Sequence, residues 1–357
     1  MSKPLVSVVM VTRNVERFLA EAIESILGQT FEDFEFIILD FGSTDSSKAI
    51  AASYGAKDSR IKLHEVASCG LTEARNASCR VAQGKYIAIM DADDVSLPNR
   101  LASQVDFMEK HPQVGLLGAL ADCMNSEGKS LGFRVHLNPP TDDEKIRLAL
   151  REQSPFCQPT IMLRREAFEV VEGYRPVLAQ AEDYDLFVRI AERFCCAGLE
   201  QVVLNYRIHP HQLSMHKQRQ QSLCMLAAQA SAAARRNGKP DPLDSVKEIT
   251  PKVVEYLGIS MAAQRSSLVQ EWETWIRFLC MAGEEHAALS AALEVLGSDL
   301  RYVERRRVSD LHLTVAWLYW REKKRSRSIL SAGRAVAMRP QVVGRPLKAL
   351  LRRMGMA

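Results

Sequence analysis

Short apolar runs that alternate with amphipathic segments constrain the fold of this chain more than any other feature of its sequence. The first hundred residues hold four strand-like runs of six or seven residues, and the first of them, Leu5–Val11, is a continuous apolar run typical of a strand buried in a parallel sheet. Segments with apolar residues at helical spacing separate these runs. The alternation predicts an α/β fold with a largely parallel sheet flanked by helices. The runs are Leu5–Val11, Phe34–Leu39, Ile61–Val66 and Lys85–Met90.

Polar residues stand at the carboxyl ends of three of these predicted strands. Open α/β sheets bind their ligands at the carboxyl ends of the strands, so these residues are candidates for a binding site. They are Thr12, Arg13 and Asn14 after the first run, Asp40 after the second, and Asp91 and Asp93 after the fourth.

Asp91 and Asp93 are the most specific of these candidates. They are two residues apart at a strand end, which places their side chains on one face. Paired carboxylates of this kind suit a hard divalent cation, Mg²⁺ or Mn²⁺, whose remaining ligands are phosphate and water. The alternative is a solvated acidic turn that caps the following helix.

Three further candidates lie outside the strand ends just described. Asp183 stands at the start of an amphipathic helix, where an acid either stabilises the helix terminus or serves as a general base. His209 follows a predicted strand and could ligate a metal or contact phosphate. Arg75, on a helix behind a turn at Gly70, either reaches a bound base or phosphate or is solvated.

The chain becomes helical beyond about residue 216. The sequence Asn237–Pro242 reads as a linker and predicts two domains, residues 1–236 and an all-helical region of residues 243–357. Residues 275–340 weakly suggest two helix-turn-helix units with tetratricopeptide-like spacing. Plain antiparallel helices are the alternative.

Positive charge is concentrated at the end of the chain. From residue 301 onward there are 15 Lys and Arg against 3 acids, although the net charge of the whole chain is only +4. This asymmetry predicts an anionic partner, and an anionic membrane surface contacted through residues 301–357 is one hypothesis. A solvated helical surface is the alternative. No zinc-finger, RNP or helix-turn-helix pattern supports a nucleic-acid partner.

The sequence also predicts a cytoplasmic location. The chain begins directly on its first apolar run without a signal-peptide pattern, and no apolar run is long enough to span a membrane. Its eight cysteines show no CxxC spacing, which favours reduced thiols over a zinc site or a disulfide framework. If the basic tail docks on lipid, the protein lies on the inner face of the cell membrane.

Eight ordered stretches between about residues 4 and 215 resemble glycosyltransferase family 2, the inverting enzymes of the GT-A fold. The resemblance implies a nucleotide-diphospho-sugar transferase domain with a mixed, Rossmann-like sheet. The stretches are Val6–Asn14, Ile38–Asp45, Gly70–Ser78, Gly84–Asp94, Leu97–Leu101, Gln158–Arg165, Ala181–Arg193 and Asn205–Ser214.

The resemblance also implies a role for each candidate residue. In the family, the matching positions hold the nucleobase, the rest of the nucleotide, a divalent cation and the catalytic base. Transferred to this chain, Thr12, Arg13, Asn14 and Asp40 hold the nucleobase, Arg75 and Asp91 the nucleotide, and Asp93 with His209 the Mn²⁺ or Mg²⁺, while Asp183 is the base.

The implied function is inverting hexosyl transfer from a nucleoside-diphosphate sugar, with UDP favoured, to a saccharide or lipid-linked acceptor in cell-surface polysaccharide or glycolipid synthesis. Two departures fall in the nucleobase pocket. Arg13 replaces the usual tyrosine, although its guanidinium could still stack on a base, and Phe41 replaces a second acid. A non-catalytic sugar-nucleotide binder or scaffold remains the alternative. A dinucleotide-dependent dehydrogenase is disfavoured because no GxGxxG follows the first strand.

Overall fold

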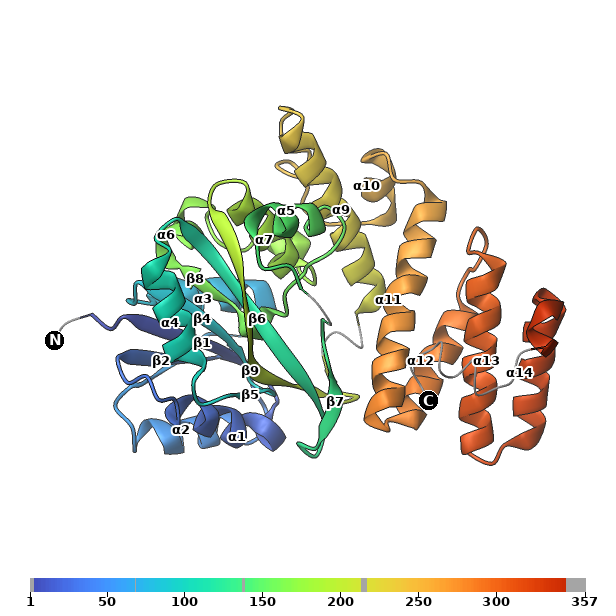
Figure 1. The fold of residues 1–357 in the computed structure, drawn as a ribbon, viewed down its shortest axis with the longest axis horizontal. Helices are drawn as coiled ribbons and strands as arrows, with labels where there is room; N and C mark the ends of the chain where they lie inside the picture. The colour runs from blue at the N-terminus through green and yellow to red at the C-terminus, as the bar shows by residue number, and fades with distance from the viewer. Residues whose placement is uncertain (1–2, 68, 137–138, 213–216, 345–357) are drawn as a thin grey trace. The chain divides into compact units, whose positions relative to one another are not determined.

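The structure is a computed structural model that describes residues 3–67, 69–136, 139–212 and 217–344 (Figure 1). Residues 345–357 of the predicted basic tail therefore lie outside the described residues. The chain forms two compact units. The predicted division into residues 1–236 and 243–357 stays a prediction, because each unit contains segments from before residue 236. The sheet unit comprises Met1–Met124, Gly132–Arg207 and Ala228–Val246, and the helical unit comprises Asn125–Leu131, Ile208–Ala227 and Lys247–Ala357.

A nine-stranded mixed sheet with the order β3-β2-β1-β4-β8-β6-β9-β5 organises the sheet unit, and β7 pairs with β6. The first four strands in that order are parallel, whereas β8 runs antiparallel to both β4 and β6. The predicted α/β fold with a sheet flanked by helices is confirmed. The strands are β1 (Val6–Thr12), β2 (Phe34–Asp40), β3 (Ile61–Glu65), β4 (Tyr86–Asp91), β5 (Val95–Ser96), β6 (Val114–Asn125), β7 (Ser130–Arg134), β8 (Met162–Arg164) and β9 (Cys195–Ile208).

The register of the parallel strands brings the predicted site residues to one edge. Thr12 at the end of β1 pairs with Asp40 at the end of β2. On the other side of β1, Val11 pairs with Asp91 at the end of β4. The carboxyl ends of three strands thus carry polar side chains next to one another.

Alternation along the strands divides their apolar side chains between helices on two faces. Val8, Met10 and Phe36 belong to a core cluster that also contains residues of α1, α2 and α4. On the opposite face, Leu39 and Phe41 pack with Ala74 of α3. The helices of this unit are α1 (Glu16–Leu27), α2 (Ser47–Gly55), α3 (Leu71–Val81), α4 (Arg100–Lys110), α5 (Asp143–Ala149), α6 (Arg165–Val170) and α7 (Glu182–Ala191), with short 3₁₀ turns at Gln158–Thr160 and Pro176–Leu178.

The predicted all-helical C-terminal region is confirmed in the helical unit, where α11, α12, α13 and α14 pack one against the next. Ser260 caps α11 by accepting a hydrogen bond from the Ala263 N–H, and Gly283 ends it in the left-handed conformation at φ 81°. Whether the helix pairs are tetratricopeptide-like stays a prediction. The helices beyond the sheet are α9 (Gln218–Arg236), α10 (Pro251–Tyr256), α11 (Met261–Ala282), α12 (Glu285–Gly297), α13 (Arg305–Arg321) and α14 (Arg325–Met338), followed by a 3₁₀ turn at Pro340–Gly344.

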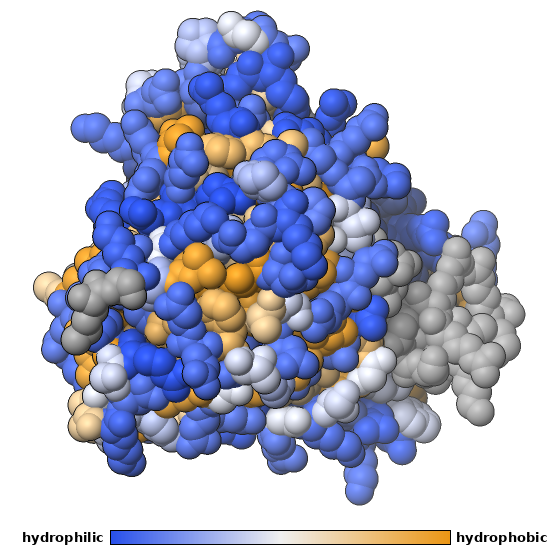
Figure 2. Space-filling model, turned by 60° about the vertical axis from the view of Figure 1, so that its left-hand side comes forward, coloured by the Kyte–Doolittle hydropathy of each residue, from blue (hydrophilic) through white to orange (hydrophobic). Residues whose placement is uncertain are grey.

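The exterior of the protein is mainly hydrophilic on the face drawn in Figure 2, and hydrophobic residues gather there in smaller patches. Within the residues that the structure describes, no helix combines the length and apolar character needed to cross a membrane.

Candidate active site

Asp40 is the acceptor at the centre of the loop that follows β2. Its Oδ1 accepts hydrogen bonds from the backbone N–H groups of Gly42 and Ser43, each at 3.0 Å, while Thr12 Oγ1 donates to its Oδ2 at 3.3 Å. Burial raises the pKa of Asp40, but the bonds from Ser43 and Gly42 and the charge of Lys48 outweigh burial, so the pKa lies below its ordinary value. Asp40 is thus an ionised carboxylate whose Oδ2 is the less heavily bonded oxygen.

Asn14 joins the loop after β1 to the loop after β2. It adopts a left-handed backbone conformation with φ 53°, which asparagine tolerates better than most residues. Its side-chain oxygen accepts from the Thr44 N–H at 2.8 Å, and its own N–H donates to Ser43 Oγ at 3.1 Å. Asn14 therefore fixes the two loops that carry Arg13 and Asp40.

Arg13 and Phe41, the two departures from the family pattern, lie together. Phe41 is buried against Leu39 and Ala74, so its ring belongs to the core beneath α3. The guanidinium carbon of the exposed Arg13 lies 5.7 Å from the centroid of that ring. Arg13 rather than Phe41 is therefore the residue that offers a planar group to solvent here.

Arg75 of α3 links the end of β4 to the start of α7. Its Nη2 lies 3.1 Å from Asp91 Oδ1, and its Nη1 forms an ion pair with Glu182. The Arg75 side chain is only 11% exposed, and the two carboxylates raise its pKa above the ordinary value even though burial opposes this. Sequence reasoning placed Arg75 beside the nucleotide, and it did not identify Glu182 as a partner of this arginine.

Asp183 lies at the start of α7, close to these charges. Burial raises its pKa to about 6, and Glu182 adds to the effect while Arg75 opposes it. The backbone N–H of Tyr184 donates to Asp183 Oδ1 at 2.7 Å. A carboxylate with a pKa near 6 is mostly ionised at neutral pH and can still accept a proton, which are the properties of a general base.

An ion-pair network inside the sheet unit holds α7 in place. Asp185, which is 1% exposed, accepts from Arg175 Nε at 2.9 Å and from Arg189 Nε at 2.8 Å. Arg175 also forms an ion pair with Asp241, with Nη1 2.8 Å from Oδ2, and Arg235 pairs with the same aspartate. Helix α7, whose first turn contains Asp183, is therefore anchored by buried charges, each of which has a partner.

The turn after β4 carries a third acid that sequence reasoning missed. Asp94 is buried, and its Oδ1 accepts from the Arg207 N–H at 2.8 Å. Within the described residues, its Oδ2 is buried without a hydrogen-bond partner. Burial raises the pKa of Asp94 well above its ordinary value, and Asp93 and Asp91 raise it further. The side chain of Arg207 braces the same turn by donating from Nε to the Asp93 carbonyl oxygen at 2.7 Å.

The donor set around Asp93 fits a hard divalent cation. Burial raises the pKa of both Asp91 and Asp94, and the charge of Asp93 raises both further. The buried Oδ2 of Asp94 has no donor among the described residues. Those residues contain no group of three or more His, Cys, Asp or Glu that could ligate a metal by itself. Mg²⁺ and Mn²⁺ need only one or two protein carboxylates when phosphate and water complete the shell. His209 is buried in the helical unit whereas Asp93 is in the sheet unit, so their joint ligation stays a prediction.

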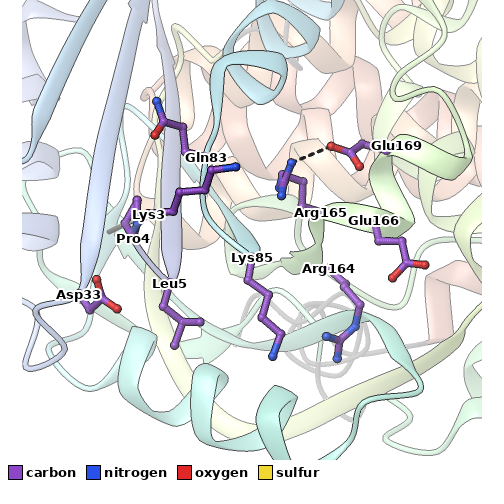
Figure 3. Close-up of a pocket in the computed structure, with 10 residues that line it drawn as sticks. All are labelled: Lys3, Pro4, Leu5, Asp33, Gln83, Lys85, Arg164, Arg165, Glu166 and Glu169. Carbon is purple, nitrogen blue, oxygen red and sulfur yellow. Dashed lines mark hydrogen bonds and ion pairs between the residues drawn. The ribbon is translucent and has the colours of Figure 1, made fainter. Parts of the chain in front are cut away.

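A cavity of about 410 Å³ lies at the amino ends of β1 and β4, the edge opposite the candidate site (Figure 3). Lys3, Lys85 and Arg165 contribute to its lining. Lys85 pairs with Glu109 at 2.7 Å and Arg165 with Glu169 at 3.0 Å, so two of these cations are neutralised. None of the predicted site residues lines this cavity.

Comparison with known proteins gives matches to both the sequence and the fold. A family profile described as "Glycosyl transferase family 2" matches residues 7–171. "Putative glycosyltransferase EpsE" of Bacillus subtilis is 39% identical over 195 residues, which are 54% of this chain and 68% of that protein. "O-antigen biosynthesis glycosyltransferase WbnJ" of Escherichia coli is 32% identical over 212 residues, 57% of this chain and 80% of that protein.

Two solved structures share the fold at low sequence identity. Residues 1–349 of S. aureus TarS, in complex with UDP-GlcNAc, align with a TM-score of 0.55 at 17% identity, covering 93% of this chain and 91% of that one. The mannosyltransferase PcManGT from Pyrobaculum calidifontis, with GDP-Man and Mn²⁺, aligns with a TM-score of 0.51 at 18% identity, covering 96% and 88%. These alignments confirm the predicted fold class.

Proposed function

The chain belongs to glycosyl transferase family 2, and from this premise we propose that it is an inverting enzyme that moves a hexosyl group from a nucleoside-diphosphate sugar to an acceptor hydroxyl. The main structural support for this proposal is the arrangement of carboxylates around Arg75. This buried arginine lies between Asp91, at the nucleotide end of the sheet, and Glu182, the neighbour of a carboxylate whose pKa is raised to about 6.

Asp183 is the proposed general base. It removes the proton from the acceptor hydroxyl while the oxygen of that hydroxyl attacks C1 of the donor sugar from the face opposite the diphosphate. The bond from C1 to the diphosphate oxygen breaks as the new glycosidic bond forms, so the configuration at C1 inverts. A single base with no carboxylate nucleophile suits this one-step displacement.

The nucleotide is proposed to lie along the carboxyl ends of β1, β2 and β4. Asp40 Oδ2 accepts from a base N–H, which is available on uracil, and the Arg13 guanidinium stacks on the base plane. The complexes of TarS with UDP-GlcNAc and of PcManGT with GDP-Man support a nucleoside-diphosphate sugar as donor. The family resemblance favours UDP as its nucleotide. Thr12 and Asn14 hold this pocket in shape, and Asp91 lies toward the ribose and diphosphate.

Asp93 is proposed to hold Mn²⁺ or Mg²⁺, with His209 as a further candidate ligand. When bound, the cation would stabilise the negative charge of the departing diphosphate as a Lewis acid. The Mn²⁺ in the complex of PcManGT supports this assignment. Asp94 and Arg207 hold the turn in which Asp93 lies.

The proposed acceptor is a saccharide or a lipid-linked sugar, and the proposed role is cell-surface polysaccharide or glycolipid synthesis. The proposed location is cytoplasmic. The relative that acts in O-antigen biosynthesis supports this class of acceptor.

A screen of nucleotide sugars tests the proposal. Purified protein is incubated with UDP- and GDP-linked hexoses, with Mn²⁺ or with a chelator, and both thermal shift and release of nucleoside diphosphate are measured. At least one donor should raise the melting temperature and be hydrolysed slowly in a cation-dependent way. Donor binding without turnover, unaltered by Asp183→Asn, would favour the non-catalytic binder instead. The exposed Asp244→Asn serves as the matched control.

A further inference from the structure

The turn between α13 and α14 carries large apolar side chains that solvent reaches. Trp320, at the end of α13, is 52% exposed, while Ile329 and Leu330 in the first turns of α14 are 69% and 58% exposed. We call the segment from Trp320 to Leu330 the α13–α14 corner; Figure 1 labels both helices. Single exposed apolar residues are common, but a group of them within one short segment marks an interaction surface.

One contact and the helical spacing relate Trp320, Arg325 and Ile329 to one another. The guanidinium carbon of Arg325 lies 3.3 Å from the centroid of the Trp320 ring, and Arg325 Nη1 donates to the Trp320 carbonyl oxygen at 3.5 Å. Ile329 follows Arg325 by four residues on α14, so the two side chains share a helix face. The indole, the guanidinium and the aliphatic side chain therefore follow one another along the surface.

Positive charge is in excess at the corner, which holds five basic residues and one acid. Two of the cations are neutralised by glutamates, in the pairs Arg321 with Glu285 at 2.7 Å and Lys324 with Glu322 at 2.6 Å. The remaining three, Lys323, Arg325 and Arg327, form no ion pair with a carboxylate in the part of the chain that the structure describes. Three uncompensated cations thus belong to the same short segment as the exposed indole and aliphatic side chains, and Arg325 contacts the indole directly.

We propose that the α13–α14 corner docks the protein on the surface of an anionic lipid bilayer. Tryptophan is favoured at the headgroup level of a membrane, where its ring is half apolar and half hydrated. The three cations face acidic headgroups, while Ile329 and Leu330 reach the boundary with the acyl chains. A nucleic acid would neutralise the cations and leave the two aliphatic side chains in water, so charge and apolar exposure together favour lipid.

This inference does not rest on the proposed transfer reaction, because it concerns residues of the helical unit alone. It also replaces the broad hypothesis of a basic tail over residues 301–357 by one short surface. Several of the other arginines in that range are neutralised by acids, as Arg301 is by Asp299, Arg307 by Glu273 and Arg339 by Asp310.

Vesicle flotation of the full chain tests the charge component. The probes are vesicles of phosphatidylcholine alone or mixed with phosphatidylglycerol, at low and physiological salt. The wild-type protein should float with the anionic vesicles only. The triple variant K323Q/R325Q/R327Q should bind them about 100-fold more weakly, from about fivefold per cation. The triple variant K62Q/K129Q/K239Q, which removes three exposed lysines elsewhere, is the matched control and should bind within about twofold of wild type.

Tryptophan emission tests the apolar component. The emission of Trp320, obtained as the difference between wild type and Trp320→Phe, should shift to the blue on anionic vesicles. Trp320→Ser should weaken binding, whereas Tyr256→Ser at a residue 86% exposed should not. Equal recovery on neutral and anionic vesicles, an unmoved Trp320 emission, or binding to RNA in place of vesicles would overturn the proposal. Thermal unfolding verifies that each variant folds, and donor hydrolysis on the same samples reports separately on the transfer reaction.

Discussion

Arg75 contacts both Asp91 and Glu182, and its charge lowers the pKa of Asp183. Replacing Arg75 by glutamine removes that charge. A cation within about 4–6 Å typically lowers the pKa of a carboxyl by about 1–3 units. Without it, we expect the pKa of Asp183 to rise from about 6 to about 7 or higher. A general base acts in its ionised form, so activity is lost as the pH falls through this pKa.

The size of the effect follows from the ionised fraction. With a rise of about one unit, the variant should be roughly fivefold less active than wild type at pH 6 and nearly equal to it at pH 8. The assay is kcat/KM for nucleoside diphosphate release between pH 5 and 9 at constant ionic strength. The exposed Arg193→Gln, which removes a guanidinium elsewhere on the sheet unit, is the control and should leave the profile unchanged.

One result would refute this reasoning. If Arg75→Gln raised KM for the donor by the same factor at every pH, Arg75 would act as a nucleotide ligand, as the family resemblance implies, and not through the charge of Asp183. Thermal unfolding accompanies the assay, because removing one partner of a buried ion pair costs about 3–5 kcal/mol and can lower stability by itself.

Three further outcomes are expected. Asp185→Asn should remove the buried carboxylate shared by Arg175 and Arg189 and lower the free energy of unfolding, obtained from urea unfolding curves, by about 3–5 kcal/mol. The exposed Asp244→Asn should change it by less than about 0.5 kcal/mol. Gly118→Ala should also destabilise, by about 1–3 kcal/mol, because a Cβ there would lie 2.1 Å from the Phe156 ring; an unchanged midpoint would contradict this packing. Chelation should abolish donor hydrolysis, and added Mn²⁺ or Mg²⁺ should restore it. Asp93→Asn should raise the cation concentration needed for half-maximal activity. Activity that survives chelation would contradict the role of Asp93.

The sequence predicted the parallel half of the fold because β1, β2 and β4 are local runs rich in apolar residues. Strand β3 lies at the edge of the sheet, and only Ile61 of it is buried. Strand β8 has only three residues, Met162–Arg164, and it becomes a strand through its pairing with β4 and β6 rather than through its own pattern. The antiparallel part of the sheet therefore could not be predicted from periodicity. The carboxyl-end residues Thr12, Asp40 and Asp91 were identifiable, because strand ends are a local property.

The electrostatics of the site depend on contacts between distant segments. Arg75 and Glu182 are 107 positions apart, and nothing local to either residue indicates that they pair. The same holds for Asp94 and Arg207, which are 113 positions apart. Asp183 could be identified from its motif, but its raised pKa could not, since burial and the neighbouring carboxylates exist only in the folded chain.

The central claim is that Asp183 is the base of a sugar transfer, and one comparison tests it most directly. Release of nucleoside diphosphate from the best donor is measured for wild type and for Asp183→Asn, with donor affinity measured on the same samples. The account predicts a loss of about 100-fold or more in the rate for the variant with donor affinity unchanged, since general-base catalysis contributes about 10²–10⁴-fold. Equal rates in the two proteins would contradict it.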